Sequence, residues 1–389
     1  MIPRIAQARL QRLSLGFPVL VLTGPRQSGK TTLARSAFPK HRYLSLEDPD
    51  LRELAVNDPR GLLASDQGGM ILDEVQRAPQ LLSYLQTSVD AAPDMGRWVL
   101  TGSHNLMLSA AVGQSLAGRA GFMELLPLAY AEAPKRFGPL SLDEFLVQGG
   151  YPALLDRPVL PADWHASYVA SYIERDVRQI SRVADLMLFQ RFMRMMAART
   201  GQLLNLNSVA SDLGIAQTTA RDWLGVLEAS YITFRLMPYH TNFGKRLVKS
   251  PKLYFHDTGL AAWLLGVSDA QALQHHPMRG ALFENMLVLE YLKHCRNLGL
   301  NNGLYFWRDN NGNEVDLLIE RAGELWPVEM KSGATFQAEW LRGLRTWEQH
   351  AQSARRGRPM LVCSVPGHFV SQGVGVVNWR EAVMQLAPQ

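Results

Sequence analysis

Short apolar runs alternate with segments of helical periodicity through the first third of the chain. Each run is about as long as a buried strand, and the runs lie at 19–23, 42–46, 69–73, 98–102 and 121–126. Unbroken apolar strands are typical of parallel sheets whose two faces are both covered by helices. The pattern therefore predicts an α/β fold that begins with a parallel-sheet domain over residues 1–136.

The pattern becomes helical after this domain. Over residues 137–200, apolar side chains recur at three- and four-residue spacing, at Tyr168, Tyr172, Ile173, Val177 and Ile180. This spacing predicts a helical lid or linker. A charged stretch within it, Glu174-Arg175-Asp176, is interpreted as ion pairs on the helix surface.

Residues 201–270 show the pattern of a helix-turn-helix with a wing. Apolar positions, a small residue and a turn glycine fall at the expected spacing, at Val209, Ala210, Leu213, Gly214, Ile215, Trp223 and Leu224. Strand-type residues at 231–234 and 252–255 follow and predict a two-stranded wing. In a winged helix the start of the second helix contacts DNA, so the candidate contacts are Gln217, Thr218, Thr219 and Arg221. A module used only for subunit packing is the alternative.

Residues 278–389 are predicted to form a second α/β domain. A helix starts near 280, and two strands over 314–331 are joined by a turn at Ala322-Gly323. Such a hairpin brings Asp316 close to Glu329.

Glu284 on the predicted helix adds a third carboxylate to this pair. Lys331 shares a strand face with Glu329, because side chains alternate along a strand. Three carboxylates are suitable ligands for one or two divalent cations, and an amine can orient water, as phosphodiester hydrolysis requires. Structural acids that Lys331 partly neutralises are the alternative.

The clearest chemical signal follows the first apolar run. It is a Gly-x-x-x-x-Gly-Lys-Thr loop between a strand and a helix, the P-loop arrangement that binds nucleoside triphosphates. Its candidate ligand-binding residues are Gly24, Pro25, Arg26, Gln27, Ser28, Gly29, Lys30, Thr31 and Thr32. The backbone N–H groups surround the phosphates, Lys30 reaches the β- and γ-phosphates, and the Thr31 hydroxyl binds Mg²⁺. ATP and Mg²⁺ are therefore the expected cofactors.

Polar residues at later strand ends complete this predicted site. Asp73 would hold Mg²⁺ and Glu74 would polarise the attacking water, so the pair indicates hydrolysis. Ser103 or His104 follows the fourth strand and could sense the γ-phosphate, with capping of the next turn as the alternative.

Two arginines are further candidates for approaching the nucleotide. Arg119 could stabilise charge from the same chain or from a neighbouring subunit, and a solvated loop arginine is the alternative. Arg175, within the charged stretch of the predicted lid, could approach the nucleotide as well.

The distribution of charge along the chain suggests that the protein has a polyanion as a partner. The chain has 389 residues and a formal net charge of +5. The window between Ala229 and His256 contains no acid, and its basic residues are Arg235, Lys245, Arg246, Lys249 and Lys252. Local basic stripes of this kind favour nucleic acid, and Lys245, Arg246 and Lys249 are the candidate DNA contacts. A solvated surface is the alternative.

Other features of the sequence bear on location. No apolar run approaches the length of a membrane span, and the N-terminus has no secretory apolar segment. The two cysteines, Cys295 and Cys363, have no metal-ligand pattern around them and are expected to be reduced. These features predict a cytoplasmic protein without a membrane partner.

Taken in order, the motifs resemble one prokaryotic family. The P-loop, the Ile71 to Glu74 strand end and the Leu100-Thr101-Gly102-Ser103 strand end look like an AAA-type ATPase core. Further motifs of the same family are Gly149-Gly150-Tyr151-Pro152, Tyr172 to Asp176, Phe283-Glu284-Asn285, Glu314-Val315-Asp316 and Val328-Glu329-Met330-Lys331. Members of this family join the ATPase to a winged helix and a C-terminal domain of unknown function similar to PD-(D/E)xK nucleases.

The resemblance implies nucleotide contacts from the P-loop, hydrolysis at Asp73 and Glu74, and metal ligation at Glu284, Asp316 and Glu329 with Lys331. It also implies a homo-oligomer in the form of an AAA-type ring. One departure is that AAA proteins usually have asparagine at the sensor position, where this chain has Ser103-His104. The favoured interpretation is an ATPase that acts on DNA with a nuclease-like effector domain. The alternative is an ATP-dependent switch or regulator that binds DNA or a protein and cuts nothing.

Overall fold

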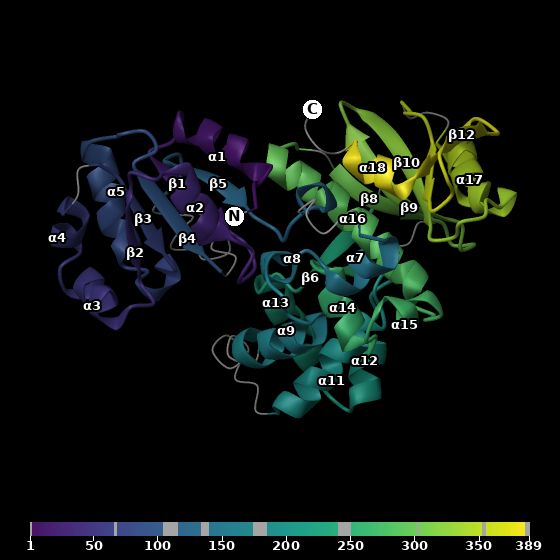
Figure 1. Ribbon diagram of the computed structural model, residues 1–389, viewed down its shortest axis with the longest axis horizontal. Coiled ribbons are helices and arrows are strands. Elements are labelled where there is room, and N and C mark those ends of the chain that lie inside the picture. Colours follow the sequence, from purple (N-terminus) through teal and green to yellow (C-terminus); the bar gives the residue numbers. More distant parts are fainter. Residues whose placement is uncertain are drawn as a thin grey trace.

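The computed structural model describes residues 2–65, 68–103, 116–133, 140–173, 185–239, 250–301, 303–351 and 355–385. Several predicted features lie outside these residues: His104, the stretch Glu174-Arg175-Asp176, and the three basic residues Lys245, Arg246 and Lys249. Figure 1 shows the N-terminal α/β domain on one side of the molecule, a mainly helical region below, and a C-terminal sheet on the other side.

The N-terminal domain is built on the predicted parallel sheet. Its strands are β1 (Val19–Thr23), β2 (Arg42–Ser45), β3 (Met70–Asp73), β4 (Trp98–Gly102) and β5 (Ala120–Glu124). They run parallel in the order β2-β3-β4-β1-β5, which places β1 between β4 and β5. All five strands lie where the apolar runs predict them, so the parallel-sheet prediction is confirmed.

Helices cover both faces of this sheet. They are α1 (Ala6–Ser14), α2 (Lys30–Ala37), α3 (Pro49–Asn57), α4 (Pro59–Ala64) and α5 (Leu81–Ala91), with a 3-10 turn, η1 (Val75–Arg77). Leu20 and Leu22 of β1 pack with α1 and α2, whereas Val19 and Val21 pack with α3, α4 and α5. The strand is buried on both sides because successive side chains point to opposite faces.

The helical region follows directly in the chain. It contains α7 (Leu142–Gln148), α8 (Pro152–Asp156), α9 (Pro161–Tyr168), the π-helical segment η5 (Val169–Ile173), α11 (Leu186–Ala197), α12 (Leu206–Leu213), α13 (Gln217–Ala229), α14 (Thr258–Leu264) and α15 (Ala270–Gln274). Asn205 caps α12, and Gly214 ends it in the left-handed conformation at φ 68°. The helix pair α12–α13 therefore occurs where the turn glycine predicts it.

The strands after this helix pair do not form a separate wing. Strands β6 (Thr233–Pro238) and β7 (Lys252–Phe255) pair antiparallel, as expected. The end of β6 also pairs in parallel with β8 (Gly303–Arg308), through Met237 and Pro238. Both strands consequently belong to the sheet of the C-terminal region, a long-range pairing that has no local signal in the sequence.

The C-terminal region is an eight-stranded sheet with helices against it. Besides β6, β7 and β8 it contains β9 (Glu314–Arg321), β10 (Glu324–Lys331), β11 (Met360–Cys363), β12 (His368–Ser371) and β13 (Val374–Asn378). The order is β12-β13-β11-β10-β9-β8-β6-β7. The helices are α16 (Arg279–Leu298), α17 (Arg342–His350) and α18 (Trp379–Met384), with 3-10 turns η3 (Tyr130–Glu132) and η6 (Ala338–Leu341). The predicted hairpin is present as β9–β10, turning at Ala322 and Gly323.

One apolar cluster joins the three predicted parts after residue 136. It extends from Tyr130 through α7, α11, α13 and α14 to Val383, so the predicted lid, winged helix and C-terminal domain share a core. Among the described residues, no helix is long and apolar enough to cross a bilayer.

Helix α16 connects this large body to the N-terminal domain. At its C-terminal half, Lys293 Nζ donates to the Leu128 carbonyl at 2.8 Å, and Glu290 accepts from the Tyr130 N–H at 2.9 Å. Arg296 forms an ion pair with Glu124 of β5 at 2.6 Å. The helix thus contacts the segment that follows β5 with several buried polar groups.

His256 lies next to this contact, and it makes the stability of the chain depend on pH. Its ring lies 4.7 Å from that of Phe234, and burial lowers the pKa of His256 to about 3, with Arg296 and Lys293 adding to the effect. The folded state keeps the imidazole neutral where the unfolded state binds a proton. The free energy of unfolding should therefore fall as pH decreases from about 6.5 towards 3.

We expect His256→Phe to make this decline shallower by ~1.4 kcal/mol per pH unit between pH 6 and 4. Urea unfolding at a series of pH values measures the slope, and His275→Phe, at an exposed position, is the control for loss of a histidine. An unchanged slope in His256→Phe would show that this ring is not held neutral.

Candidate functional site

The loop after β1 has the backbone conformation that phosphate binding needs. Gly24 has φ 144°, and a Cβ added there would lie 2.2 Å from the Leu125 carbonyl oxygen. Gly29 has φ 93° and directly precedes α2 in a left-handed conformation. Both glycines are required by geometry, because L-residues with a side chain rarely adopt these angles. The loop consequently directs its N–H groups towards one point at the start of α2.

Lys30 is buried within this loop. Its Nζ donates to the carbonyl oxygens of Gly24 at 3.0 Å and Pro25 at 2.7 Å. Burial lowers the pKa of Lys30 to about 8, although Glu74 and Asp73 act in the opposite direction. A phosphate group would supply the ammonium with negative partners in place of the two neutral carbonyls.

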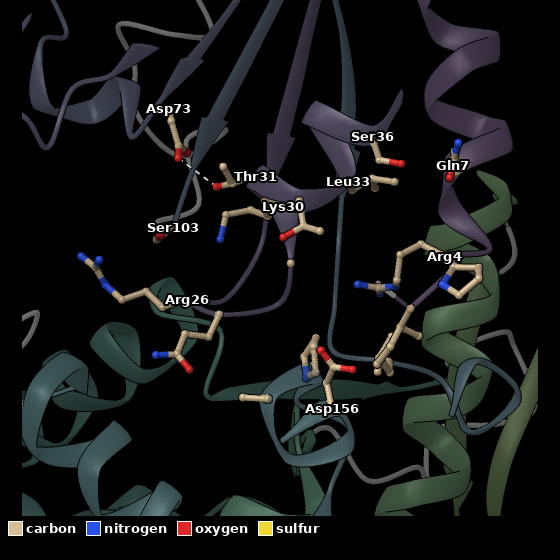
Figure 2. A pocket seen from close by; sticks show the side chains of 18 of the residues that line it. Arg4, Gln7, Arg26, Lys30, Thr31, Leu33, Ser36, Asp73, Ser103 and Asp156 are labelled. Carbon is tan, nitrogen blue, oxygen red and sulfur yellow. Dashed lines mark hydrogen bonds between the residues drawn. The ribbon is translucent and has the colours of Figure 1, made fainter. Parts of the chain in front are cut away.

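Asp73 and Thr31 lie side by side at the carboxyl edge of the sheet. The Thr31 hydroxyl donates to Asp73 at 2.9 Å (Figure 2). The Tyr43 hydroxyl donates to the same carboxylate at 2.7 Å. Thr101 of β4 is a third donor to it. Burial and the hydrogen bond to Asp73 raise the pKa of Tyr43 to about 12, so it stays a donor. A hydroxyl and a carboxylate are oxygen donors of the kind that fits Mg²⁺.

Glu74 is held in a strained conformation next to this pair. Its φ is 56°, a left-handed value that costs a non-glycine residue about 1–3 kcal/mol. Its carboxylate accepts hydrogen bonds from the Ser103 hydroxyl and the Gln76 amide. Of the two roles predicted for Ser103, the described contact favours one at the site, because the hydroxyl is bonded to the candidate base.

One cavity of about 770 Å³ is lined by Lys30, Thr31, Asp73, Glu74 and Ser103. A volume of this size is in the range of ligand sites, roughly 300–1,000 Å³. The P-loop and strand ends form one wall, and the other walls come from residues that are not predicted as site residues: Ile2, Pro3, Arg4, Gln7, Leu128, Pro152, Ala153, Asp156 and Arg157. Figure 2 shows Asp156 facing the P-loop and Arg4 beside the loop.

Arg4 connects the N-terminal segment to the site through hydrogen bonds. Its guanidinium donates to the carbonyls of Ser28 at 2.7 Å and Leu126 at 2.8 Å, and it pairs with Glu132 at 3.1 Å. A single arginine near the N-terminus has no motif around it, so no signal in the sequence marks this role.

The motif Gly149-Gly150-Tyr151-Pro152 positions α8 at the cavity. Gly149 has φ 76°, and a Cβ there would lie 2.4 Å from the Asp257 carboxylate. Asp257 accepts from the Gly150 N–H at 2.7 Å, and burial raises the pKa of Asp257 to about 6. The paired glycines are the sequence signal for this wall of the site.

Arg119 lies away from the cavity of its own chain. It follows the turn before β5 and forms an ion pair with Asp90 at 2.5 Å. The Arg119 carbonyl accepts from the Val19 N–H, which places it at the amino edge of the sheet, opposite the nucleotide loop. A role from the same chain is therefore wrong, and a role from a neighbouring subunit stays a prediction.

The C-terminal candidate residues do lie together. Lys331 Nζ lies 2.5 Å from Glu329 and 3.6 Å from Asp316, and the Met330 N–H donates to Asp316 at 2.8 Å. Glu284 reaches the same point from α16. Two members of this cluster, Glu314 and Lys252, are not predicted as site residues by the sequence pattern.

Lys252 belongs to the basic window in the sequence, and the structure corrects this interpretation. Its Nζ contacts Glu284 at 2.7 Å, Asp316 at 3.9 Å and also Glu314. Arg235 of the same window is paired with Glu228 at 2.5 Å. Neither residue is therefore a free surface charge: Lys252 is paired with acids that are distant in the sequence, and Arg235 is paired with Glu228 of the preceding helix α13.

The electrostatics of the cluster reflect its burial. Burial raises the pKa of Glu284 to about 7, although Lys252 opposes this. Burial together with Asp316 raises the pKa of Glu329 to about 8. Burial alone would lower the pKa of Lys252, but Glu284 and its other neighbours outweigh it and raise the pKa. The ammonium stays charged among these acids.

The candidate DNA contacts lie at the start of α13. Gln217, Thr218 and Arg221 are exposed, and Thr219 is half-buried. Their side chains are available at the surface, and contact with DNA stays a prediction.

Comparison with known proteins identifies three domains. Residues 16–133 match the AAA domain family, which confirms the predicted AAA-type ATPase core. Residues 140–271 match a domain of unknown function (DUF8612), and one model thus spans the predicted lid and winged helix. Residues 279–379 match another domain of unknown function (DUF4143).

Among solved structures, the Walker-type ATPase PABY2304 of Pyrococcus abyssi is similar, with 15% sequence identity and a TM-score of 0.45. The match covers 68% of this chain and 96% of that one.

Two relatives match most of this chain. The uncharacterized protein MJ1544 of Methanocaldococcus jannaschii is 22% identical, over 77% of this chain and 72% of that protein. The uncharacterized protein Rv2008c of Mycobacterium tuberculosis is 35% identical over 337 residues, 85% of this chain and 74% of that protein. In this chain an AAA-type ATPase domain is followed by two domains of unknown function. The chain therefore belongs to the family of Rv2008c.

Proposed function

We propose that this chain is a Mg²⁺-dependent ATPase whose ATP cycle drives an action on DNA. The observation that carries the ATPase assignment is the single cavity that contains Lys30, the Thr31–Asp73 pair and the Glu74–Ser103 pair. These residues supply a phosphate-binding cation, oxygen donors for a metal and a carboxylate base. A protein that only bound nucleotide would not need the base.

Each residue has a distinct role in the proposed reaction. The loop N–H groups and Lys30 bind the phosphates and stabilise charge that develops on them. Thr31 and Asp73 would hold Mg²⁺, which when bound neutralises phosphate charge. Glu74, oriented by Ser103 and Gln76, polarises the water that attacks the γ-phosphate. The water transfers its proton towards Glu74 as its oxygen bonds to the γ-phosphorus and the bond from this phosphorus to ADP breaks, which releases ADP and inorganic phosphate.

The wall formed by α8 suggests how the nucleotide affects the rest of the chain. Pro152 and Ala153 line the cavity, while Gly150 is bonded to Asp257 at the start of α14. A change at the cavity would therefore reach the helical region through a buried hydrogen bond. This continuity supports a role in which ATP controls the helical region that contains α14.

The DNA part of the proposal rests on α13 and on the basic residues that follow β6. We expect duplex DNA to stimulate ATP turnover, because binding and hydrolysis occur in connected parts of one chain. Reversing the charge of Lys245, Arg246 and Lys249 together should weaken DNA binding at least about tenfold and flatten its salt dependence, since fewer counterions are released.

Turnover is measured with single-stranded, linear and supercoiled DNA, and binding by fluorescence anisotropy at several salt concentrations. Charge reversal of the exposed residues Lys40 and Arg60, in the N-terminal domain, serves as the control. Unchanged affinity and salt slope in the triple variant would move the DNA site elsewhere. ATP turnover that no DNA form alters would contradict the DNA role and leave the ATPase assignment standing.

One observation favours a switch that does not cut DNA. The ammonium of Lys252 lies among Glu284, Glu314 and Asp316, where a nuclease of the predicted type would hold its metal. In the assay with supercoiled plasmid we expect no nicking in the presence of Mg²⁺ or Mn²⁺. Nicking that Asp316→Ala abolishes would instead assign a nuclease.

A further inference from the structure

Four carboxylates from three elements lie close together near Lys252 of β7. Glu284 comes from α16, Glu314 and Asp316 from β9, and Glu329 from β10. Oxygen atoms of Glu284, Glu314 and Asp316 all lie within 4.8 Å of one another. Buried acids at such separations repel strongly unless a cation lies between them.

Lys252 supplies that cation, and it lies outside residues 279–379, which contain all four acids. It is 1% exposed and contacts three of the four acids, and its ammonium also lies 5.6 Å from the ring of Phe306. Its strand, β7, belongs to the segment over residues 140–271, whereas all four acids belong to the segment over 279–379. The positive charge at the centre of the cluster is thus brought in by another domain.

The cluster retains one unsatisfied acceptor. Glu329 Oε2 is buried without a hydrogen-bond partner among the described residues, while Oε1 of the same group is paired with Lys331. A buried carboxylate oxygen without a donor is costly, so this atom indicates capacity for a further positive ligand.

Within the described part of the chain, three positive groups lie at the four acids of the cluster. Lys252 and Lys331 lie inside the cluster, and Arg308 pairs with Glu314 from its edge at 2.7 Å. A divalent cation that replaced one ammonium would give the orphan oxygen of Glu329 a positive partner.

An ammonium and a divalent cation cannot share this position. Lys252 Nζ lies at hydrogen-bond distance from the oxygens that a metal would need at about 2.0–2.6 Å. The two cations would also repel each other at short range in a buried site. The residues as they stand therefore do not fit a bound metal.

We propose that Lys252 is the resident cation of the Glu284–Glu314–Asp316–Glu329 cluster and keeps divalent cations out of it. Without this ammonium, the same carboxylates form a site for Mn²⁺ or Mg²⁺. A residue of the segment over 140–271 therefore keeps the acids of the segment over 279–379 free of metal. The ATPase site lies in a different cavity and does not depend on this cluster.

Mn²⁺ binding to the full chain without nucleotide tests the proposal, measured by electron paramagnetic resonance of free and bound Mn²⁺. We expect Lys252→Met to gain one Mn²⁺ site, at least about tenfold tighter than any site in the parent at this cluster. Lys252→Arg retains a cation and should gain none. Lys252→Met combined with Asp316→Asn should lose the new site.

Loss of a buried cation is destabilising, so Lys252→Met alone is at risk of not folding. The double variant Lys252→Met/Glu314→Gln removes one charge of each sign and keeps three carboxylates. A parental circular-dichroism spectrum and one cooperative thermal transition like that of the parent show that either variant is folded.

Two outcomes would overturn the proposal. The first is a Mn²⁺ site in the parent chain, with Lys252 in place, that the single variant Asp316→Asn removes. The second is a folded Lys252→Met or double variant that binds no additional Mn²⁺. Neither outcome affects the ATPase assignment, which rests on a different cavity.

Discussion

Glu74→Gln should bind ATP with near-parental affinity and lose ATP turnover by roughly 10²–10⁴-fold. The amide keeps the size of the side chain and can still contact Ser103, but it cannot accept a proton from the attacking water. The strained φ of 56° at Glu74 is also retained, so the loop geometry should not change. Phosphate release measures turnover, and a fluorescent ATP analogue measures binding.

Two variants make this result specific. Glu53→Gln removes an exposed carboxylate of α3 that does not line the cavity, so turnover should be retained. Lys30→Ala removes the buried ammonium and should abolish nucleotide binding itself. Parental turnover in Glu74→Gln would show that Glu74 is not the base.

Gly24→Ala should eliminate nucleotide binding and lower the free energy of unfolding by at least about 2 kcal/mol. The new Cβ would lie 2.2 Å from the Leu125 carbonyl oxygen, and φ 144° is unfavourable for alanine. The obstacle is backbone on both sides, so relief requires the loop or the segment after β5 to move. Either movement displaces the N–H groups that bind phosphate.

Thermal unfolding and nucleotide titration measure the two effects separately. Gly16→Ala, in the turn before β1, is the matched control, because a Cβ there has no atom of the described residues within 4 Å. Parental nucleotide affinity in Gly24→Ala would mean that the loop binds phosphate in a conformation other than the one described.

Elements with local signals can be predicted from the amino-acid sequence. The strands of the first sheet, the loop from Gly24 to Thr31 and the hairpin of β9–β10 all follow from apolar runs, turn glycines and motif spacing. In each of them the residues that set the conformation are neighbours in the chain. For the same reason, the position of Asp73 and Glu74 at the end of a buried strand is sufficient to assign both residues to the candidate site.

Long-range contacts determine which distant segments complete the sites. Arg4 and the wall formed by α8 are far apart in the chain and contribute to one cavity. Lys252 resembles the other members of a basic window, and only the pairing of β6 with β8 brings it to the acids of the C-terminal domain. The sequence specifies the charge of a lysine, but whether that charge meets solvent, DNA or a buried carboxylate depends on long-range strand pairing, for which a single sequence carries no local signal.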